Sequence, residues 1–202
     1  MKRLTFIIFF ISSLGYSQTN ELYQLAFGKS ENFRILTTFK DKIPTTFSII
    51  DTTDTWNPET FFLRDLNVRN PKVIDSIERD EHHPYFNSYL FSNEKLDSLI
   101  PDVEKERLFN LASKVTSRKV AITGQKLQLV RRFNKPLGFY FLVTAPLYAT
   151  DNKHAFLAIF VKKKEVFLGE KMDNYFATLT LMFEKNKEQR WTQIGIKENL
   201  IL

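Results

Sequence analysis

The sequence predicts an α+β fold: an antiparallel C-terminal sheet of three to five strands, with helices packed on one side. Four runs between Leu137 and Ile196 have the aromatic and β-branched composition of strands, namely LGFYFLVTAPL, HAFLAIFVK, NYFATLTLMFE and RWTQIGI. The turn-like segments ATDN and EKNKEQ form the first and the last of the three junctions between these runs. The middle junction is the longer, lysine-rich KKKEVFLGEKMD. Because a parallel crossover needs a dozen or more residues, these connections favour antiparallel neighbours.

The first seventeen residues have the pattern of a secretory signal peptide. Lys2 and Arg3 form a basic start, residues 4–14 are apolar, and Gly15 and Ser17 put small residues before a cleavage point. An uncleaved anchor is the alternative, but eleven apolar residues fall short of the ~20 that a spanning helix needs. We therefore expect export to the periplasm or the extracellular space of a Gram-negative bacterium, with no transmembrane segment in the mature chain.

Residues 18–202 are predicted to form a single globular α+β domain. Their 185 residues are enough to enclose one hydrophobic core. The chain has no cysteine, so an exported domain of this kind must be held by packing rather than by disulfides. A hydrophobic content of 43%, with 20 Phe and only six Gly, argues against a disordered chain.

The segment after the predicted cleavage point begins with a short helix. Residues 21–27 (ELYQLAF) place three apolar side chains on one face, and Thr19 or Asn20 is positioned to cap the helix. Further short elements are predicted before Pro101: strands at 33–39, 45–51 and 88–92, helices after the Asn-Pro pairs at 57–58 and 70–71, and a helical turn at 94–100.

Residues 102–115 give the clearest helix in the chain. The apolar stripe at i, i+3, i+4 and i+7 comprises Leu108, Leu111, Ala112 and Val115. Asp102 is a suitable N-cap, and the acidic first turn and the basic residues beyond the end suit the helix dipole. We expect this helix to pack on the sheet through Leu108, Leu111 and Val115.

The pattern of each C-terminal strand predicts which faces are covered. Residues 155–161 (AFLAIFV) are apolar on both faces, which predicts a central strand covered twice. Alternation also predicts half-buried strands at 126–133, 139–145 and 175–183. In the last of these, Tyr175 is predicted to share a face with Ala177, and Phe176 to lie on the opposite face.

The C-terminal third resembles a group of exported bacterial proteins of unknown function. The run TAPLYATDNKHAFLAIFV, a further long strand and the tail EKNKEQRWTQIGI are similar to a pattern in that group. Many of its members have a Cys-Gly-rich turn after the Ala-led strand, where this chain has KKKEVFLGEKMD. The resemblance covers about the last sixty residues and implies an exported protein with this kind of sheet, without an implied activity.

Charge is distributed unevenly along the chain. The formal net charge is +6, or +4 once Lys2 and Arg3 are removed. Residues 51–106 contain 13 acidic and 6 basic side chains, whereas residues 107–150 contain eight basic side chains and none that is acidic. This asymmetry indicates either a binding surface or two parts of one fold that lie against each other.

One cluster has the side chains of a metal site. It comprises Asp80, Glu81, His82 and His83, whose carboxylates and imidazoles are suitable zinc ligands. Adjacent histidines diverge, however, so the site would need ligands from elsewhere, and a solvated loop before Pro84 is the simpler interpretation. We predict no cofactor.

The sequence lacks the motifs of common enzymes. It has no Gly-x-Ser-x-Gly, no His-Glu-x-x-His, no phosphate-binding glycine loop and no cysteine nucleophile. His154 follows a predicted turn and is expected to be a strand-edge residue. A hydrolytic enzyme whose site is assembled from distant residues is therefore the alternative to a non-catalytic binding domain.

Aromatic side chains on the C-terminal strands could line a pocket if the sheet curves around a helix. They are Tyr140, Phe156, Phe160, Tyr175 and Phe176. In a chain with 20 Phe, packing in the core is the simpler interpretation. The lysine run at 162–164 is predicted to be a charged hairpin edge that discourages edge pairing.

The candidate ligand-binding residues are Lys126, Arg131, Arg132 and Lys135. Alternation places Arg131 on the apolar face of its strand, so it must pair with a carboxylate, reach a strand end, line a solvated cavity or follow a bulge. These cations either pair with the acidic half or bind an anionic envelope molecule such as an acidic glycan. The leading interpretation is an exported, non-catalytic binding or envelope-interaction domain. No nucleic-acid partner is expected.

Overall fold

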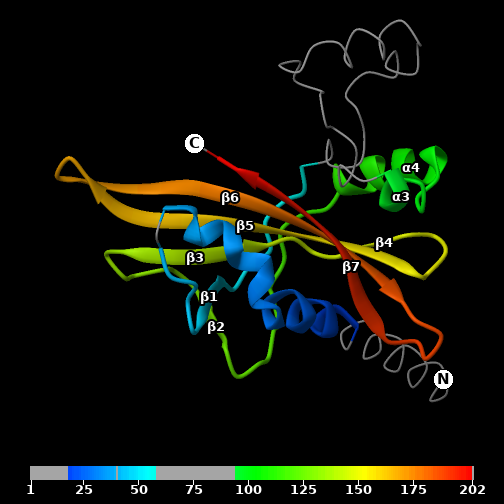
Figure 1. Ribbon diagram of the computed structural model, residues 1–202, viewed down its shortest axis with the longest axis horizontal. Helices are drawn as coiled ribbons and strands as arrows, with labels where there is room; N and C mark the ends of the chain where they lie inside the picture. Colours follow the sequence, from blue (N-terminus) through cyan, green and yellow to red (C-terminus); the bar gives the residue numbers. More distant parts are fainter. Residues whose placement is uncertain (1–17, 40, 58–93, 202) are drawn as a thin grey trace, which may run out of the picture.

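The computed structural model describes residues 18–39, 41–57 and 94–201, and there it shows a mixed, mostly antiparallel sheet (Figure 1). The strands are β1 (Phe47–Ile50), β2 (Leu127–Val130), β3 (Gly138–Val143), β4 (Leu147–Tyr148), β5 (His154–Phe167), β6 (Glu170–Lys185) and β7 (Trp191–Leu200). Their order is β2-β1-β3-β5-β6-β7, with β4 beside β5. The α+β class is confirmed, but the sheet has seven strands rather than three to five.

Strand β1 makes the sheet mixed, because it lies between β2 and β3 and runs parallel to both. The apolar pattern predicted this strand but not its neighbours. More than seventy residues of chain separate β1 from β2, which is ample for a parallel connection. Phe47 and Ile49 of β1 are buried in the core, as the apolar pattern FSII requires.

Strands β5 and β6 form one long hairpin that reaches beyond the rest of the sheet (Figure 1). The prediction of a lysine-rich linking segment at KKKEVFLGEKMD was wrong, because those residues continue both strands up to a two-residue turn at Leu168 and Gly169. Both turn residues have positive φ, 50° and 85°. Such values match the right-handed twist of a hairpin.

The face of the sheet beneath the N-terminal segment carries the larger part of the core. Residues 18–28 form the predicted helix, which buries Leu22 and Ala26 in this core and Leu25 only partly. The predicted cap was wrong, because Thr19 and Asn20 lie inside the helix and contact Tyr148 and Thr123 instead.

Residues 33–39 were predicted as a strand, and the structure contradicts this. They belong to η1 (Ser30–Phe39), a pair of 3-10 turns with a kink at Phe33. Phe33 and Leu36 are fully buried while Arg34 and Thr37 are exposed. This spacing of three is the period of a 3-10 helix, and it is too short a pattern to distinguish from strand alternation by sequence.

The opposite face of the sheet is covered by α4 (Asp102–Ala112), which follows the short helix α3 (Glu94–Asp97). Helices therefore pack on both faces, and the prediction of helices on one side was wrong. Leu108 is fully buried but Leu111 is 36% exposed, so the predicted face was also partly wrong. Asp102 does not cap α4, because Pro101 occupies the N-cap position and no side chain bonds there.

Strand β5 is central and is covered on both faces, as predicted. Leu157 and Ile159 face the core under the N-terminal helix, and Phe156 and Ala158 face α4. The helices predicted after residues 57 and 70, and the strand predicted at 88–92, lie outside the described residues. No helix within the described ranges is long and apolar enough to cross a membrane.

Candidate functional site

Three of the four candidate cations lie together in the segment that joins β2 to β3. We call residues 131–137 the basic loop; it carries Arg131, Arg132 and Lys135, all exposed. Lys126 is also exposed but precedes β2, about 16 Å from Arg131 for a fully extended strand. The structure therefore brings three of the predicted ligand-binding residues into one loop. Lys126 lies apart from them, at the other end of β2.

The predicted conflict at Arg131 is resolved by the end of a strand. Strand β2 stops at Val130, so Arg131 and Arg132 leave the regular alternation and both reach solvent. This was one of the four solutions left open by the sequence. Leu129, on the face predicted to be apolar, is itself 37% exposed, because β2 is an edge strand of the sheet.

The basic loop is anchored at its centre by Phe133, which is buried. The Phe133 ring stacks on Tyr140 of β3, with 5.0 Å between ring centroids and an interplanar angle of 18°. The Phe133 carbonyl accepts a 2.7 Å hydrogen bond from Lys164 Nζ. Gly138, with φ of +118°, ends the loop in a backbone conformation that favours glycine. The cations are thus presented from a loop that is fixed from below.

No ion pair neutralises the basic loop within the part of the chain that the structure describes. Two other cations of residues 107–150 do pair with acids of the predicted acidic half: Lys119 Nζ lies 2.6 Å from Asp51, and Arg107 Nη2 lies 2.7 Å from Glu104. The two alternatives for the charge asymmetry therefore apply to different residues. Lys119 joins two distant segments through Asp51 and Arg107 pairs within α4, whereas the basic loop stays open to solvent.

The lysine run at 162–164 is not an exposed hairpin edge as predicted. It lies inside β5, which pairs with β3 and β6 on its two sides. Lys163 Nζ is 2.8 Å from Asp41 and 3.0 Å from Glu165, and Lys162 Nζ is 3.5 Å from Asp173. Burial acts to lower the pKa of Lys163, but its two carboxylate partners outweigh burial and raise the pKa.

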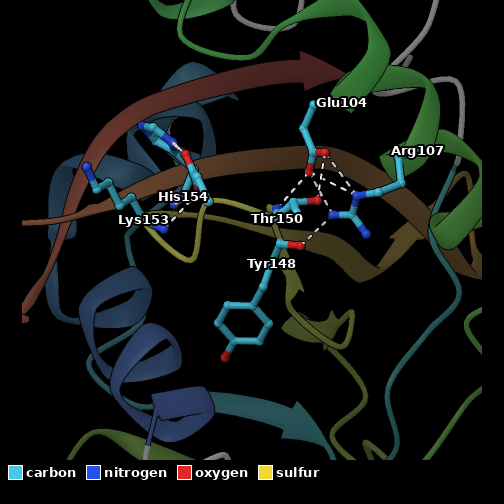
Figure 2. A network of polar contacts seen from close by, with 7 residues as sticks. Glu104, Arg107, Tyr148, Thr150, Lys153 and His154 are labelled. Carbon is cyan, nitrogen blue, oxygen red and sulfur yellow. Dashed lines mark hydrogen bonds and ion pairs between the residues drawn. The ribbon is translucent and has the colours of Figure 1, made fainter.

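A polar network joins α4 to the turn between β4 and β5 (Figure 2). Glu104 accepts hydrogen bonds from Arg107, from the Thr150 backbone N–H and from the Thr150 hydroxyl, all between 2.7 and 3.1 Å. Arg107 also donates to the Tyr148 carbonyl at 2.8 Å. Burial acts to raise the pKa of Glu104, but these hydrogen bonds outweigh it and the pKa is lowered.

His154 begins β5 and is buried, next to the same turn (Figure 2). Its Nδ1 lies 2.6 Å from Asp151 Oδ2, and Asp151 also accepts backbone N–H bonds from Lys153 and His154. The other ring nitrogen is buried, 3.9 Å from Glu184. Because Asp151 is engaged in closing the turn, the pair fits the predicted strand-edge role of His154.

The predicted metal cluster, Asp80, Glu81, His82 and His83, lies outside the described residues. Within the described ranges, no group of three or more His, Cys, Asp or Glu side chains is placed to hold a metal ion.

The five aromatic residues proposed as pocket lining separate into two groups. Phe156 and Phe176 are core residues on opposite faces of the sheet, and Tyr140 is buried beside Phe133. Phe160 and Tyr175 are less covered, with Tyr175 45% exposed. The prediction that Tyr175 shares a face with Ala177 was wrong, because a β-bulge at Phe176 shifts the register there and turns Phe176 into the core.

Fold and site together define a small α+β domain with a mixed sheet and an anchored basic loop. No protein-family model, curated protein or solved structure matches the chain. The resemblance of the last third to exported bacterial proteins stays a prediction. Sequence reasoning found the cations of the basic loop but missed the anchoring role of Phe133, which it assigned to a strand; only its stacking on Tyr140 reveals that role.

Proposed function

We propose that this chain is an exported, non-catalytic binding domain that holds an anionic molecule of the cell envelope on the basic loop. The observation that carries this proposal is the set of three exposed cations, within five residues, on a loop anchored by Phe133. Export is inferred from the N-terminal pattern alone.

The loop suits anion binding for three physical reasons. Adjacent arginines repel each other, and an anion between or beside them removes that repulsion. Guanidinium groups bind carboxylate and phosphate oxygens through paired N–H donors. Because Phe133 already fixes the loop through Tyr140 and Lys164, less conformational entropy is lost when a ligand binds.

The test is a comparison of two double variants on a heparin column, used as a generic polyanion. Arg131→Gln with Arg132→Gln removes two charges from the basic loop. Lys153→Gln with Lys187→Gln removes two exposed charges from turns at the ends of β5 and β6, so its net charge is the same. Both proteins are eluted with a salt gradient, and their unfolding in urea is measured alongside.

The basic-loop variant is expected to elute at clearly lower salt while its free energy of unfolding stays within about 0.5 kcal/mol of the parent, because both side chains are exposed. The control variant is expected to keep most of its retention. Equal loss of retention in the two variants would show that only net charge matters. Unchanged retention in the basic-loop variant would also contradict the proposal.

A further inference from the structure

A pocket of about 350 Å³ lies on the same side of the sheet as α4. Four segments that are distant in sequence form its lining: the chain that follows β1, the middle of β5, the adjacent part of β6 and Ile201, which follows β7. The residues that define its chemistry are Asp54, Trp56, Phe160, Tyr175 and Thr178. None of the basic-loop residues lines it, so it is a second site.

Aromatic rings from three of these segments line the pocket. Phe160 and Tyr175 meet edge to face, with 6.2 Å between centroids and an interplanar angle of 80°. Trp56 is held by its indole N–H, which donates a 2.7 Å hydrogen bond to the Ala145 carbonyl. Rings fixed in this way can offer their electron-rich faces to a positive charge.

Tyr175 already has a cation on its ring. Lys162 Nζ lies 4.7 Å from the Tyr175 centroid, which is within the range of a cation–π contact. The charge of Lys162 is balanced by Asp173 at 3.5 Å. The Tyr175 ring therefore already accepts one cation, and the charge of that cation is offset by Asp173 rather than by Asp54.

Asp54 gives the pocket a negative charge. Its carboxylate accepts a 2.8 Å hydrogen bond from the Thr55 backbone N–H, and within the described residues no cation forms an ion pair with it. Burial raises the pKa of the Tyr175 hydroxyl, and the negative charges of Asp54 and Asp173 raise it further. An anionic ligand would be repelled here, whereas a cation would be attracted.

We propose that this pocket binds an organic cation, specifically the alkylammonium group of a small ligand, between the aromatic rings and the Asp54 carboxylate. The rings supply contact with the methyl or methylene groups around the nitrogen, and Asp54 supplies the counter-charge. The site differs in sign from the basic loop, so this proposal does not rest on the proposed anion binding.

The experiment uses choline and its uncharged isostere 3,3-dimethylbutan-1-ol as probes, which differ by replacement of the ammonium nitrogen with carbon. Binding of each to the protein is measured by titration calorimetry. Asp54→Asn removes the charge from the pocket, and Tyr175→Ala removes an exposed ring. Glu188→Gln, in the exposed β6–β7 turn, removes the same charge elsewhere and serves as the control.

Choline is expected to bind up to about fivefold more tightly than the isostere, which is the upper limit for one partly exposed charge pair. Asp54→Asn should reduce that preference, Tyr175→Ala should weaken choline binding, and Glu188→Gln should change neither. Equal affinity of the two probes, an unchanged choline affinity in Asp54→Asn, or no saturable choline binding would each overturn the proposal. Because the basic loop is untouched, heparin retention of Asp54→Asn reports independently on the anion site.

Discussion

At the scale of single residues, the backbone of a few positions decides where side chains point. The bulge at Phe176 turns its ring into the core beside Phe139, with 5.1 Å between centroids, and leaves Tyr175 on the pocket face. The end of β2 at Val130 releases Arg131 to solvent. In both places one residue departs from strand alternation, and a candidate site lies beside that departure.

The turn of the β5–β6 hairpin provides a test at this scale. Leu168 has φ of 50° and a side chain that is 89% exposed, so it adopts a strained left-handed conformation without packing to compensate. Leu168→Asn should stabilise the protein by about 0.5–1 kcal/mol, because Asn-Gly is the preferred pair for such a turn. Urea unfolding measures the change.

Gly169→Ala is the opposing control, expected to destabilise by about 1 kcal/mol at a φ of 85°. If Leu168→Asn destabilised the protein as much as Gly169→Ala, the Leu168 side chain would have a contact partner in solution, and the explanation from backbone strain would be wrong.

At the scale of elements, α4 illustrates how an apolar stripe can be wider than the buried face. The helix was predicted to extend to 115 but ends at Ala112, so Val115 of the predicted stripe packs against this core from beyond the helix. Within α4, Leu108 and Ala112 face the sheet. Leu111 lies at the border and is 36% exposed. Hydrogen bonds between Glu104 and Thr150 hold α4 in this orientation, and Thr150 lies outside the helix.

Alanine substitutions distinguish the two sides of α4. Leu108→Ala removes a fully buried side chain and is expected to cost about 2–5 kcal/mol in the free energy of unfolding. Leu111→Ala changes the same residue type on the same helix and should cost less than about 1 kcal/mol, because its side chain is already partly in water. Denaturant unfolding measures both losses in the free energy of unfolding. Equal losses in the two variants would contradict the observed rotation of α4.

At the scale of the whole molecule, one sheet carries two cores. The first lies under residues 18–28 and η1, and the second lies under α4. Strand β5 contributes to both, which makes it the structural centre of the domain. Hydrogen bonds of the Glu104 network connect α4 to Tyr148 and Thr150 at the β4–β5 turn (Figure 2).

This connection makes stability dependent on pH. The pKa of Glu104 is lowered in the folded protein because hydrogen bonds from Arg107 and Thr150 outweigh its burial. A lowered pKa means that Glu104 stabilises the fold above its unfolded pKa, about 4.3, and that this stabilisation is lost as the pH falls through the lower folded value. Glu104→Gln should therefore be less stable than the parent at pH 7, and the difference should shrink below about pH 4.

Urea unfolding from pH 7 to pH 3 measures that difference. Glu106→Gln is the matched control, because Glu106 is exposed on the same helix. This variant is expected to have a free energy of unfolding at pH 7 within about 0.5 kcal/mol of the parent. A constant difference between Glu104→Gln and the parent at all pH values would show that the carboxylate charge is not the stabilising feature.

The sequence predicted most of the elements because their patterns are local. Alternation located the C-terminal strands, and the doubly apolar run at 155–161 correctly indicated a central strand. The periodicity at 21–27 indicated a helix that is present. The cations of the basic loop were also identified, since a run without acidic residues is visible in the sequence alone.

The sequence by itself determined the α+β class, the strands of the C-terminal sheet and the basic character of the segment before β3. Tertiary structure alone decided that β1 lies between β2 and β3, that helices cover both faces, and that Phe133 anchors the basic loop. It also gathered Asp54, Phe160 and Tyr175 around one pocket. The physical reason is that a local pattern fixes which face of an element is apolar, whereas long-range packing fixes what that face meets.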